Sequence, residues 1–317
     1  MSALSAISVD LDSPKHYCRI YGLPESILDD AAVNLVERVA IPRFLELFAN
    51  AQVPATFFAV GEDLERPSAA QAIKTAAQAG VEIASHSYAH DYAMSRGTAE
   101  AIGADLQRAD ALIERSAGVR PVGFRAPGYT LTPSLLNATV AQGYAYGSST
   151  FPAAPYYGLK ALVMGVQALV GKPSRSILDS PRVLTAPRAP YHPSESDPYA
   201  RGSLPVWELP VTVTPVFRVP FYGTLAVALP WAWVAQTYRS AATSELMNFE
   251  LHAIDVLDAT DGWPQALASR QRDLGVPASE KMKRLATLFS WFARDGECLT
   301  LAGVAHRLSM DEVKRGK

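Results

Sequence analysis

Residues 55–90, ATFFAVGEDLERPSAAQAIKTAAQAGVEIASHSYAH, contain the alternation that decides the fold class. The run of threonine, phenylalanine and valine at 55–61 predicts a strand. The run at 71–79 predicts a helix that ends at Gly80, and the apolar run at 81–85 predicts a second strand. A strand, a helix and another strand at this spacing indicate a parallel sheet or barrel with helices outside it.

The same alternation continues on both sides of this segment. Upstream, we expect a strand at 6–10 and a helix that opens at Pro42, where proline suits the first helical turn. Downstream, the pattern predicts a helix at 98–118 with Gly118 as its stop, a strand at 122–125, a helix at 132–143 and a strand at 144–148.

The alternation stops in the middle of the chain. Nine prolines between Pro152 and Pro205 leave room for one helix at most, at about residues 159–170. Regular order returns with expected strands at 206–213 and 247–254, a helix at 279–296, and a terminal strand and helix at 297–308. We therefore predict one α/β domain over residues 1–317, with residues 151–203 as an insertion or lid within it.

Composition excludes several classes of protein. The chain of 317 residues is 49% hydrophobic, which supplies a core and excludes a disordered tail. Its 29 Lys and Arg against 31 Asp and Glu leave no basic excess, so nucleic acid is not an expected partner. Two cysteines, Cys18 and Cys298, cannot build a disulfide framework.

The amino-terminal residues and two apolar stretches indicate where in the cell the protein is expected. The start, MSALSAISVDLD, has no basic region and no apolar run of signal length, so we expect a cytoplasmic protein. The stretches at 156–171 and 219–235 are shorter than the roughly 20 residues that a spanning helix needs. They could lie against the inner face of a membrane, or form a helix packed on the barrel and a strand of the core.

Two aspartates follow the first expected strand. Asp10 and Asp12 stand at its carboxyl end, where α/β sheets and barrels build their active sites. The alternative is that both aspartates only cap a turn before Ser13 and Pro14.

Two of the six histidines lie in one short segment. His86 and His90, in SHSYAH after the expected strand at 81–85, are four residues apart, a spacing that puts both rings on one side of a helical turn. Together with an aspartate from a neighbouring strand end, they could hold a metal and leave coordination positions open for water and substrate. A ferrous oxygenase site has a similar composition, but the alternation of strand and helix opposes the jelly roll on which such sites are usual.

Two more titratable side chains end expected strands. Arg125 is the last residue of the strand at 122–125 and could pair with a catalytic carboxylate and hold it ionised, or it could be a surface charge. His252 ends the strand at 247–254 and has the chemistry of a general acid, although a lone histidine is more often structural.

The segments SVDLD, SHSYAH, FRAPGY and FELHAID, in this order, resemble the successive motifs of the NodB-homology polysaccharide deacetylases. The resemblance implies a distorted (β/α) barrel. It implies that Asp12, His86 and His90 bind one divalent metal ion, usually zinc, and that Asp10 is the general base. It further implies that Arg125 orients Asp10, that the backbone amide of Gly128, beside Tyr129, contacts the oxyanion and substrate, and that His252 is the general acid.

Two positions depart from the family pattern. The family usually places its two aspartates side by side, whereas Leu11 separates Asp10 from Asp12, so the base and the ligand could be exchanged. Many members have Tyr-Asp-Ser-Ser where this chain has Tyr-Gly-Ser-Ser at 146–149, so an acidic group is missing at Gly147.

The expected activity is metal-dependent removal of an N-acyl group, acetyl or formyl, from an amino sugar, a glycan or a lipid-linked sugar. The missing export signal favours a substrate inside the cell. Two alternatives stay open: an amidase on a small non-sugar amide, linear or cyclic, and a barrel that binds metal and ligand without catalysis.

Overall fold

The structure, a computed structural model, describes residues 4–169 and 177–315. Within these ranges eight strands form one sheet in which every pair of neighbours is parallel. The strands are β1 (Leu4–Asp10), β2 (Thr56–Ala59), β3 (Glu82–Ser85), β4 (Gly123–Phe124), β5 (Tyr146–Gly147), β6 (Trp207–Glu208), β7 (Leu246–His252) and β8 (Glu297–Cys298).

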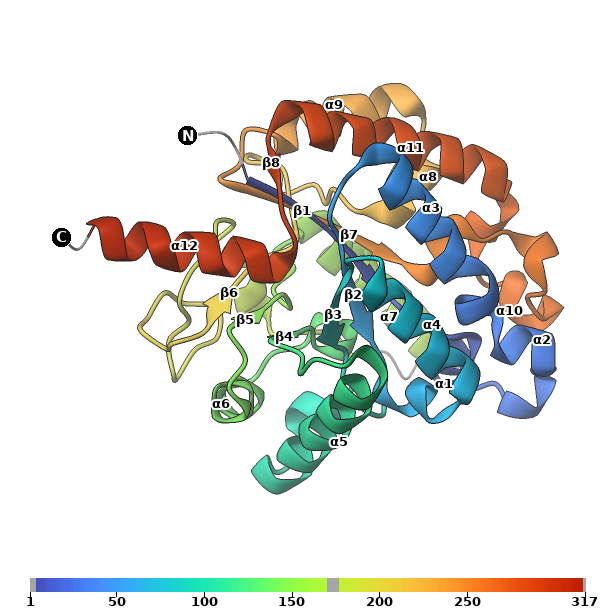
Figure 1. The fold of residues 1–317 in the computed structure, drawn as a ribbon, viewed down its shortest axis with the longest axis horizontal. Coiled ribbons are helices and arrows are strands. Elements are labelled where there is room, and N and C mark those ends of the chain that lie inside the picture. Colours follow the sequence, from blue (N-terminus) through green and yellow to red (C-terminus); the bar gives the residue numbers. More distant parts are fainter. Residues whose placement is uncertain (1–3, 170–176, 316–317) are drawn as a thin grey trace.

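The sheet curls into an open barrel (Figure 1). Its strand order is β6-β5-β4-β3-β2-β1-β7, and β8 pairs with the first two residues of β1. No pairing between β6 and β7 closes the barrel in the described ranges. Because all strands are parallel, their carboxyl ends meet at one rim, which is where a site can form.

Helices surround the sheet (Figure 1). The first half of the chain contributes α1 (Pro14–Tyr21), α2 (Asp30–Val33), α3 (Ile41–Ala51), α4 (Pro67–Gln78), α5 (Ala99–Ala117) and α6 (Pro133–Gln142). The second half contributes α7 (Ala154–Leu169), α8 (Gly223–Ala228), α9 (Trp231–Ala241), α10 (Gln265–Ala268), α11 (Ala278–Asp295) and α12 (Leu301–Arg315). A π-helical turn, Val36–Ala40, leads into α3.

Strand β1 separates two apolar clusters by the alternation of its side chains. Ile7 and Val9 pack in the outer cluster with aromatic residues of α3 and α11, such as Phe44 and Phe289. Ala6 packs in the inner cluster, which also contains apolar side chains of α12. Because successive strand residues face opposite sides, Ser8 and Asp10 share the inner face of the curled sheet.

The fold class predicted from the sequence is confirmed, because the sheet is parallel and its strands alternate with helices. The helix at 98–118 is also confirmed, and it ends at Gly118, whose φ of 80° is the left-handed conformation that favours glycine. Helix α7 is the α-helix expected between 150 and 205. Of its expected span, Val170 lies outside the described residues.

Two predictions about strands are wrong. Only Trp207–Glu208 of the expected strand at 206–213 is a strand of the sheet, although the amides of Leu209, Val211 and Thr212 still donate to the carbonyl oxygens of Gly147, Thr150 and Asn248. The stretch at 219–235 contains no core strand but α8 and the start of α9, separated at Pro230. In the described part of the chain, no helix has both the length and the apolar character that crossing a bilayer requires.

Candidate active site

Asp12, His86 and His90 lie together at the carboxyl rim of the sheet. Oδ1 of Asp12 is 3.1 Å from Nε2 of His90 and 3.5 Å from Nε2 of His86. One ligand atom from each of the three residues lies within 4.8 Å of the other two, and all three side chains are buried. The structure therefore brings together the three residues that the resemblance implies as metal ligands.

The ring of His86 is oriented by the backbone. Its Nδ1–H donates to the carbonyl oxygen of Arg125 at 2.8 Å, which leaves Nε2 facing Asp12. A second hydrogen bond of this kind is usual for metal-binding histidines, because it fixes the ring and its tautomer. The residue that follows β4 thus orients a ring that follows β3.

The prediction that His86 and His90 share a helical turn is wrong. Residues 86–90 form an irregular loop in which Ser87 and His90 have φ values of 65° and 50°. The backbone amide of His90 donates a hydrogen bond to the hydroxyl of Ser87. The carboxylate of Asp105 accepts hydrogen bonds from the backbone amides of Tyr88 and Ala89. These bonds stabilise a left-handed conformation that non-glycine residues rarely adopt.

The donor set fits a divalent metal. Oδ1 of Asp12 and Nδ1 of His90 are buried and make no hydrogen bond to a described residue. Burial by itself would raise the pKa of Asp12, but the neighbouring histidines hold it well below its usual range, so the carboxylate is charged. One carboxylate oxygen and two imidazole nitrogens are the ligands of catalytic zinc sites with open positions.

Asp10 is held by the buried guanidinium of Arg125. Nη1 of Arg125 donates to Oδ1 of Asp10 at 2.6 Å. Nε and Nη2 of this guanidinium donate to Ser148 and Ser8, and its Cζ lies 4.1 Å from the ring centroid of Phe58. Asp10 is therefore fixed in orientation, while Asp12, two residues later, faces the histidines.

His252 lies beside Asp10 because the two residues are register partners in β7 and β1. Its Nδ1 is 2.9 Å from Oε1 of Glu250, a fully buried side chain that sequence reasoning missed. Burial favours the neutral ring, but the charges of Glu250, Asp10 and Asp12 raise the pKa of His252 well above its usual value. The signal was present in the sequence, because residues two apart on a strand share a face.

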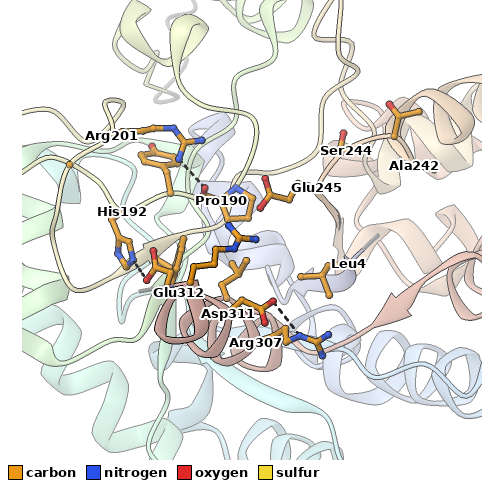
Figure 2. A pocket seen from close by; sticks show the side chains of 16 residues that line it. Leu4, Pro190, His192, Arg201, Ala242, Ser244, Glu245, Arg307, Asp311 and Glu312 are labelled. Carbon is orange, nitrogen blue, oxygen red and sulfur yellow. Dashed lines mark hydrogen bonds and ion pairs between the residues drawn. The ribbon is translucent and has the colours of Figure 1, made fainter. Parts of the chain in front are cut away.

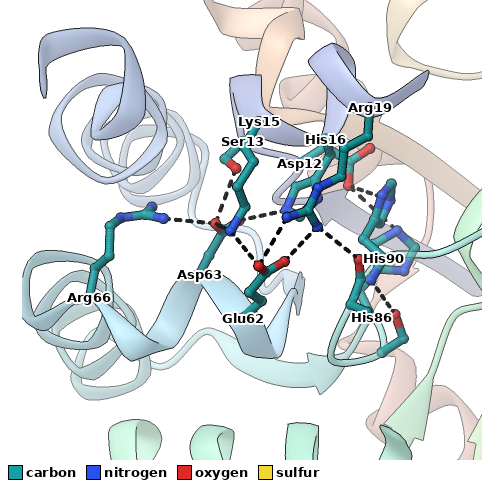
Figure 3. Close-up of polar contacts among 12 residues, drawn as sticks. Asp12, Ser13, Lys15, His16, Arg19, Glu62, Asp63, Arg66, His86 and His90 are labelled. Carbon is teal, nitrogen blue, oxygen red and sulfur yellow. Dashed lines mark hydrogen bonds and ion pairs between the residues drawn. The ribbon is translucent and has the colours of Figure 1, made fainter. Parts of the chain in front are cut away.

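A second missed pair lies beside the metal-ligand candidates (Figure 3). His16, on α1, is buried, and its Nε2 is 2.9 Å from Oδ2 of Asp63. Its ring centroid is 4.7 Å from that of His90. Arg66 and Ser13 also bond Asp63, so His16 is fixed by an anchored carboxylate and packs against His90.

Gly128 requires its residue type. Its φ is 66°, and a Cβ there would lie 3.1 Å from the ring of Tyr92. The next residue, Tyr129, also has a positive φ, and its hydroxyl is 3.4 Å from Nε2 of His252. The loop after β4 thus brings both residues to the same cavity as the ligands.

That cavity has a volume of about 190 Å³. Six tyrosine and phenylalanine side chains line it, including Tyr17 of α1, and two of them, Phe151 and Tyr156, come from the predicted insertion. Its lining residues include Asp10, Asp12, His86, His90, Tyr92, Gly128, Tyr129, Phe151, Tyr156, Lys160, Tyr222, His252 and Asp273. All the candidate residues except Arg125, which acts through Asp10, therefore face one space.

A larger cavity of about 820 Å³ lies at the opposite end of β1, beside Leu4 (Figure 2). Several of its charged side chains pair with one another, as His192 does with Glu312 and Arg307 with Asp311. Leu4 and Asp10 are six positions apart along β1, which is roughly 20 Å of strand. This cavity contributes nothing to the candidate site.

Comparison with known proteins confirms the resemblance. Residues 28–147 match the family model described as polysaccharide deacetylase. A peptidoglycan deacetylase of Helicobacter pylori is 30% identical over 156 residues, which are 49% of this chain and 52% of that protein. The chain thus matches about half the length of this curated relative.

Solved structures show the same fold. A protein from Mycobacterium smegmatis with a provisional assignment as a polysaccharide deacetylase superposes with a TM-score of 0.61 at 17% identity, over 98% of this chain and 92% of that one. Puue allantoinase superposes with a TM-score of 0.54 at 16% identity, over 96% and 89%. At these identities the likeness concerns the fold alone.

Proposed function

We propose that this protein is a metal-dependent hydrolase that removes an N-acyl group from an amino sugar. One observation carries the proposal: the Asp12, His86 and His90 cluster faces the same small cavity as Asp10 and His252. The match to the polysaccharide deacetylase family and the peptidoglycan deacetylase relative support a sugar as the substrate.

Asp12, His86 and His90 would hold one divalent ion, with zinc as our choice. Such an ion supplies two effects when bound: it polarises an amide carbonyl and lowers the pKa of a bound water towards about 7. The assignment of Asp12 as the ligand is supported by its unbonded Oδ1 beside both histidines. Asp10 is the better base, because Arg125 fixes Oδ1 of its carboxylate and leaves Oδ2 to accept the proton.

Asp10 removes the proton of the attacking water. The charge that then develops on the substrate oxygen needs a hydrogen-bond donor, which we assign to the backbone amide of Gly128. His252, kept protonated by Glu250, donates its proton to the nitrogen of the departing amine, which is too basic to leave as an anion. The carboxylate product and the free amine are then released.

The size of the cavity favours a small substrate unit. Its volume of about 190 Å³ is below the roughly 300–1,000 Å³ of pockets for drug-sized ligands, and its aromatic walls suit one sugar ring. The same volume favours a small non-sugar amide as the second candidate substrate. For a lipid-linked sugar, three exposed apolar side chains of α7, Leu159, Leu162 and Val163, would provide the contact with a membrane.

The test is release of acetate or formate from N-acylated amino sugars and small amides, by the purified protein with zinc and after chelation. We expect release from at least one sugar, lost on chelation and restored by metal. Release of acetate or formate from the small amides alone would show that the substrate is a small non-sugar amide and not an amino sugar. Release from none, by a protein that binds zinc, would refute hydrolysis.

A further inference from the structure

The charged side chains that line the cavity have partners, with one exception. Each of the three lining carboxylates has a cationic side chain or a histidine within 4 Å, and His252 has a carboxylate. The pairs are Asp10 with Arg125, Asp12 with His90, Asp273 with Lys281, and His252 with Glu250. Lys160, on α7, also lines the cavity and has no carboxylate within 4 Å among the described residues. A divalent ion on Asp12 would add positive charge to this balance.

The sequence directly after Lys160 supplies no carboxylate before Asp179. Residues 170–176, VGKPSRS, which follow α7, contain no Asp or Glu. The carboxylate that acts on Lys160 through space is Asp179, whose oxygens accept hydrogen bonds from Tyr199 and Ser180. Burial lowers the pKa of Lys160 to about 8, so its ammonium is still mostly charged at pH 7.

The surroundings of Lys160 are aromatic. Its Nζ lies 5.9 Å from the ring centroid of Tyr156, which packs on Phe151 at 5.0 Å. Phe151 contacts Tyr129 at 5.2 Å, and Tyr129 reaches towards His252. A continuous aromatic wall therefore runs from the reacting groups to a half-buried ammonium that has no carboxylate within 4 Å among the described residues.

We propose that Lys160 binds an anionic group, carboxylate or phosphate, carried by the N-acylated sugar whose amide reaches the Asp12, His86 and His90 cluster. The substrates are then acidic amino sugars rather than neutral ones. An ammonium that is partly removed from water gains most from a charged acceptor, because such hydrogen bonds are about twice as strong as neutral ones. This inference rests on the function proposed above for the same cavity.

The first test compares three sugars that share an N-acetyl group: N-acetylglucosamine, N-acetylmuramic acid with its carboxylate, and N-acetylglucosamine 6-phosphate. We expect wild type to favour an acidic sugar in kcat/KM, and Lys160→Met to reduce the ratio of acidic to neutral by roughly tenfold. Lys160→Arg should keep the preference, and Lys160→Glu should invert it. Lys74→Met, at an exposed lysine on α4, is the matched control and should keep the wild-type ratio.

The second test measures binding of the same sugars by calorimetry to Asp10→Asn, with and without Lys160→Met, and so needs no turnover. A Lys160-dependent preference for the carboxylate or for the phosphate identifies which anion the site takes. Binding with that dependence but no hydrolysis by wild type would refute the proposed function and keep the inference. Hydrolysis with equal ratios in wild type and Lys160→Met would overturn the inference and keep the function.

Discussion

The carboxylate of Glu208 fills the space that a side chain at Gly147 would enter. The two residues are register partners in β6 and β5, and a Cβ at residue 147 would lie 2.5 Å from Oε2 of Glu208. Oε1 of Glu208 accepts the backbone amides of Ser149 and Thr150 at 2.7 and 2.6 Å. The acidic group that the family resemblance implies for position 147 is absent, and the carboxylate beside this position comes from the neighbouring strand.

This relationship predicts that Gly147→Asp is strongly destabilising and that Glu208→Ala relieves it. The aspartate alone overpacks the site and places two carboxylates together, which costs about 1–3 kcal/mol or more of unfolding free energy. Glu208→Ala alone leaves two buried amides unsatisfied, at about 1–3 kcal/mol each. Chemical denaturation measures the unfolding free energy of both single variants and of the double variant. We expect the double variant to lose less unfolding free energy than the two single variants lose together. If the two losses simply add, the idea that the two carboxylates compete for the same space is wrong.

The sequence predicted the site better than it predicted the backbone that carries it. Asp10, Asp12, His86, His90 and His252 face one cavity, since parallel strands bring their carboxyl ends to one rim. The loop at 86–90 was mistaken for a helical turn, because a spacing of four does not reveal that Ser87 and Asp105 hold a left-handed backbone.

Partners distant in the chain could not be predicted. Glu208 and Gly147 become neighbours only through the pairing of β6 with β5, and His16 meets Asp63 across 47 residues. Glu250 was within reach, since strand periodicity places it on the same face as His252. The helices α8 and α9 were missed because an apolar run interrupted by Pro230 fits a strand as well as two short helices.

The two aspartates should separate in their effects on metal. We expect His86→Ala and His90→Ala to reduce zinc content sharply because each removes a ligand nitrogen of the cluster, and Asp12→Asn to reduce it because the carboxylate loses its charge. Asp10→Asn and His252→Ala should retain the metal and lose turnover, since both act on protons. Elemental analysis and rates of the five variants check this. Loss of zinc in Asp10→Asn with retention in Asp12→Asn would show that base and ligand are exchanged.

Glu250→Gln should narrow the active pH range on its alkaline side. The charge of Glu250 raises the pKa of His252 and keeps this acid protonated to higher pH. Removing that charge lowers the pKa of His252, so the alkaline limb of the activity profile moves to lower pH. The profile of kcat/KM against pH measures the shift, and zinc content should stay unchanged. Glu245→Gln, at an exposed position before β7, is the control. An unmoved alkaline limb would refute the role of Glu250.

His16→Ala should weaken metal binding without unfolding the protein. His16 packs against His90 and is fixed by Asp63, so its loss frees a ligand ring to turn. Residues that orient ligands typically contribute about 10–100-fold in metal affinity. Competition with a chromogenic chelator measures the change, and Asp63→Asn should give the same direction. His306→Ala, exposed on α12, should bind zinc as wild type does. Equal affinity in all variants would make His16 a packing residue only.

The exposed side of α7 should decide whether the protein contacts membranes. Leu159 and Leu162 are 61% and 64% exposed on the helix that also carries Lys160 to the cavity. Burying a leucine contributes up to about 1.5–3 kcal/mol, so losing both should reduce partitioning into vesicles by at least roughly tenfold. We expect wild type to sediment with vesicles that carry a polyprenyl-linked N-acetylated sugar, and Leu159→Glu/Leu162→Glu to stay in solution. Val313→Glu, at a 57% exposed residue of α12, should behave as wild type because α12 lies at the other end of the strands. Wild type that does not sediment would assign the substrate to solution, and a double variant that sediments as wild type does would leave α7 as a wall of the cavity only.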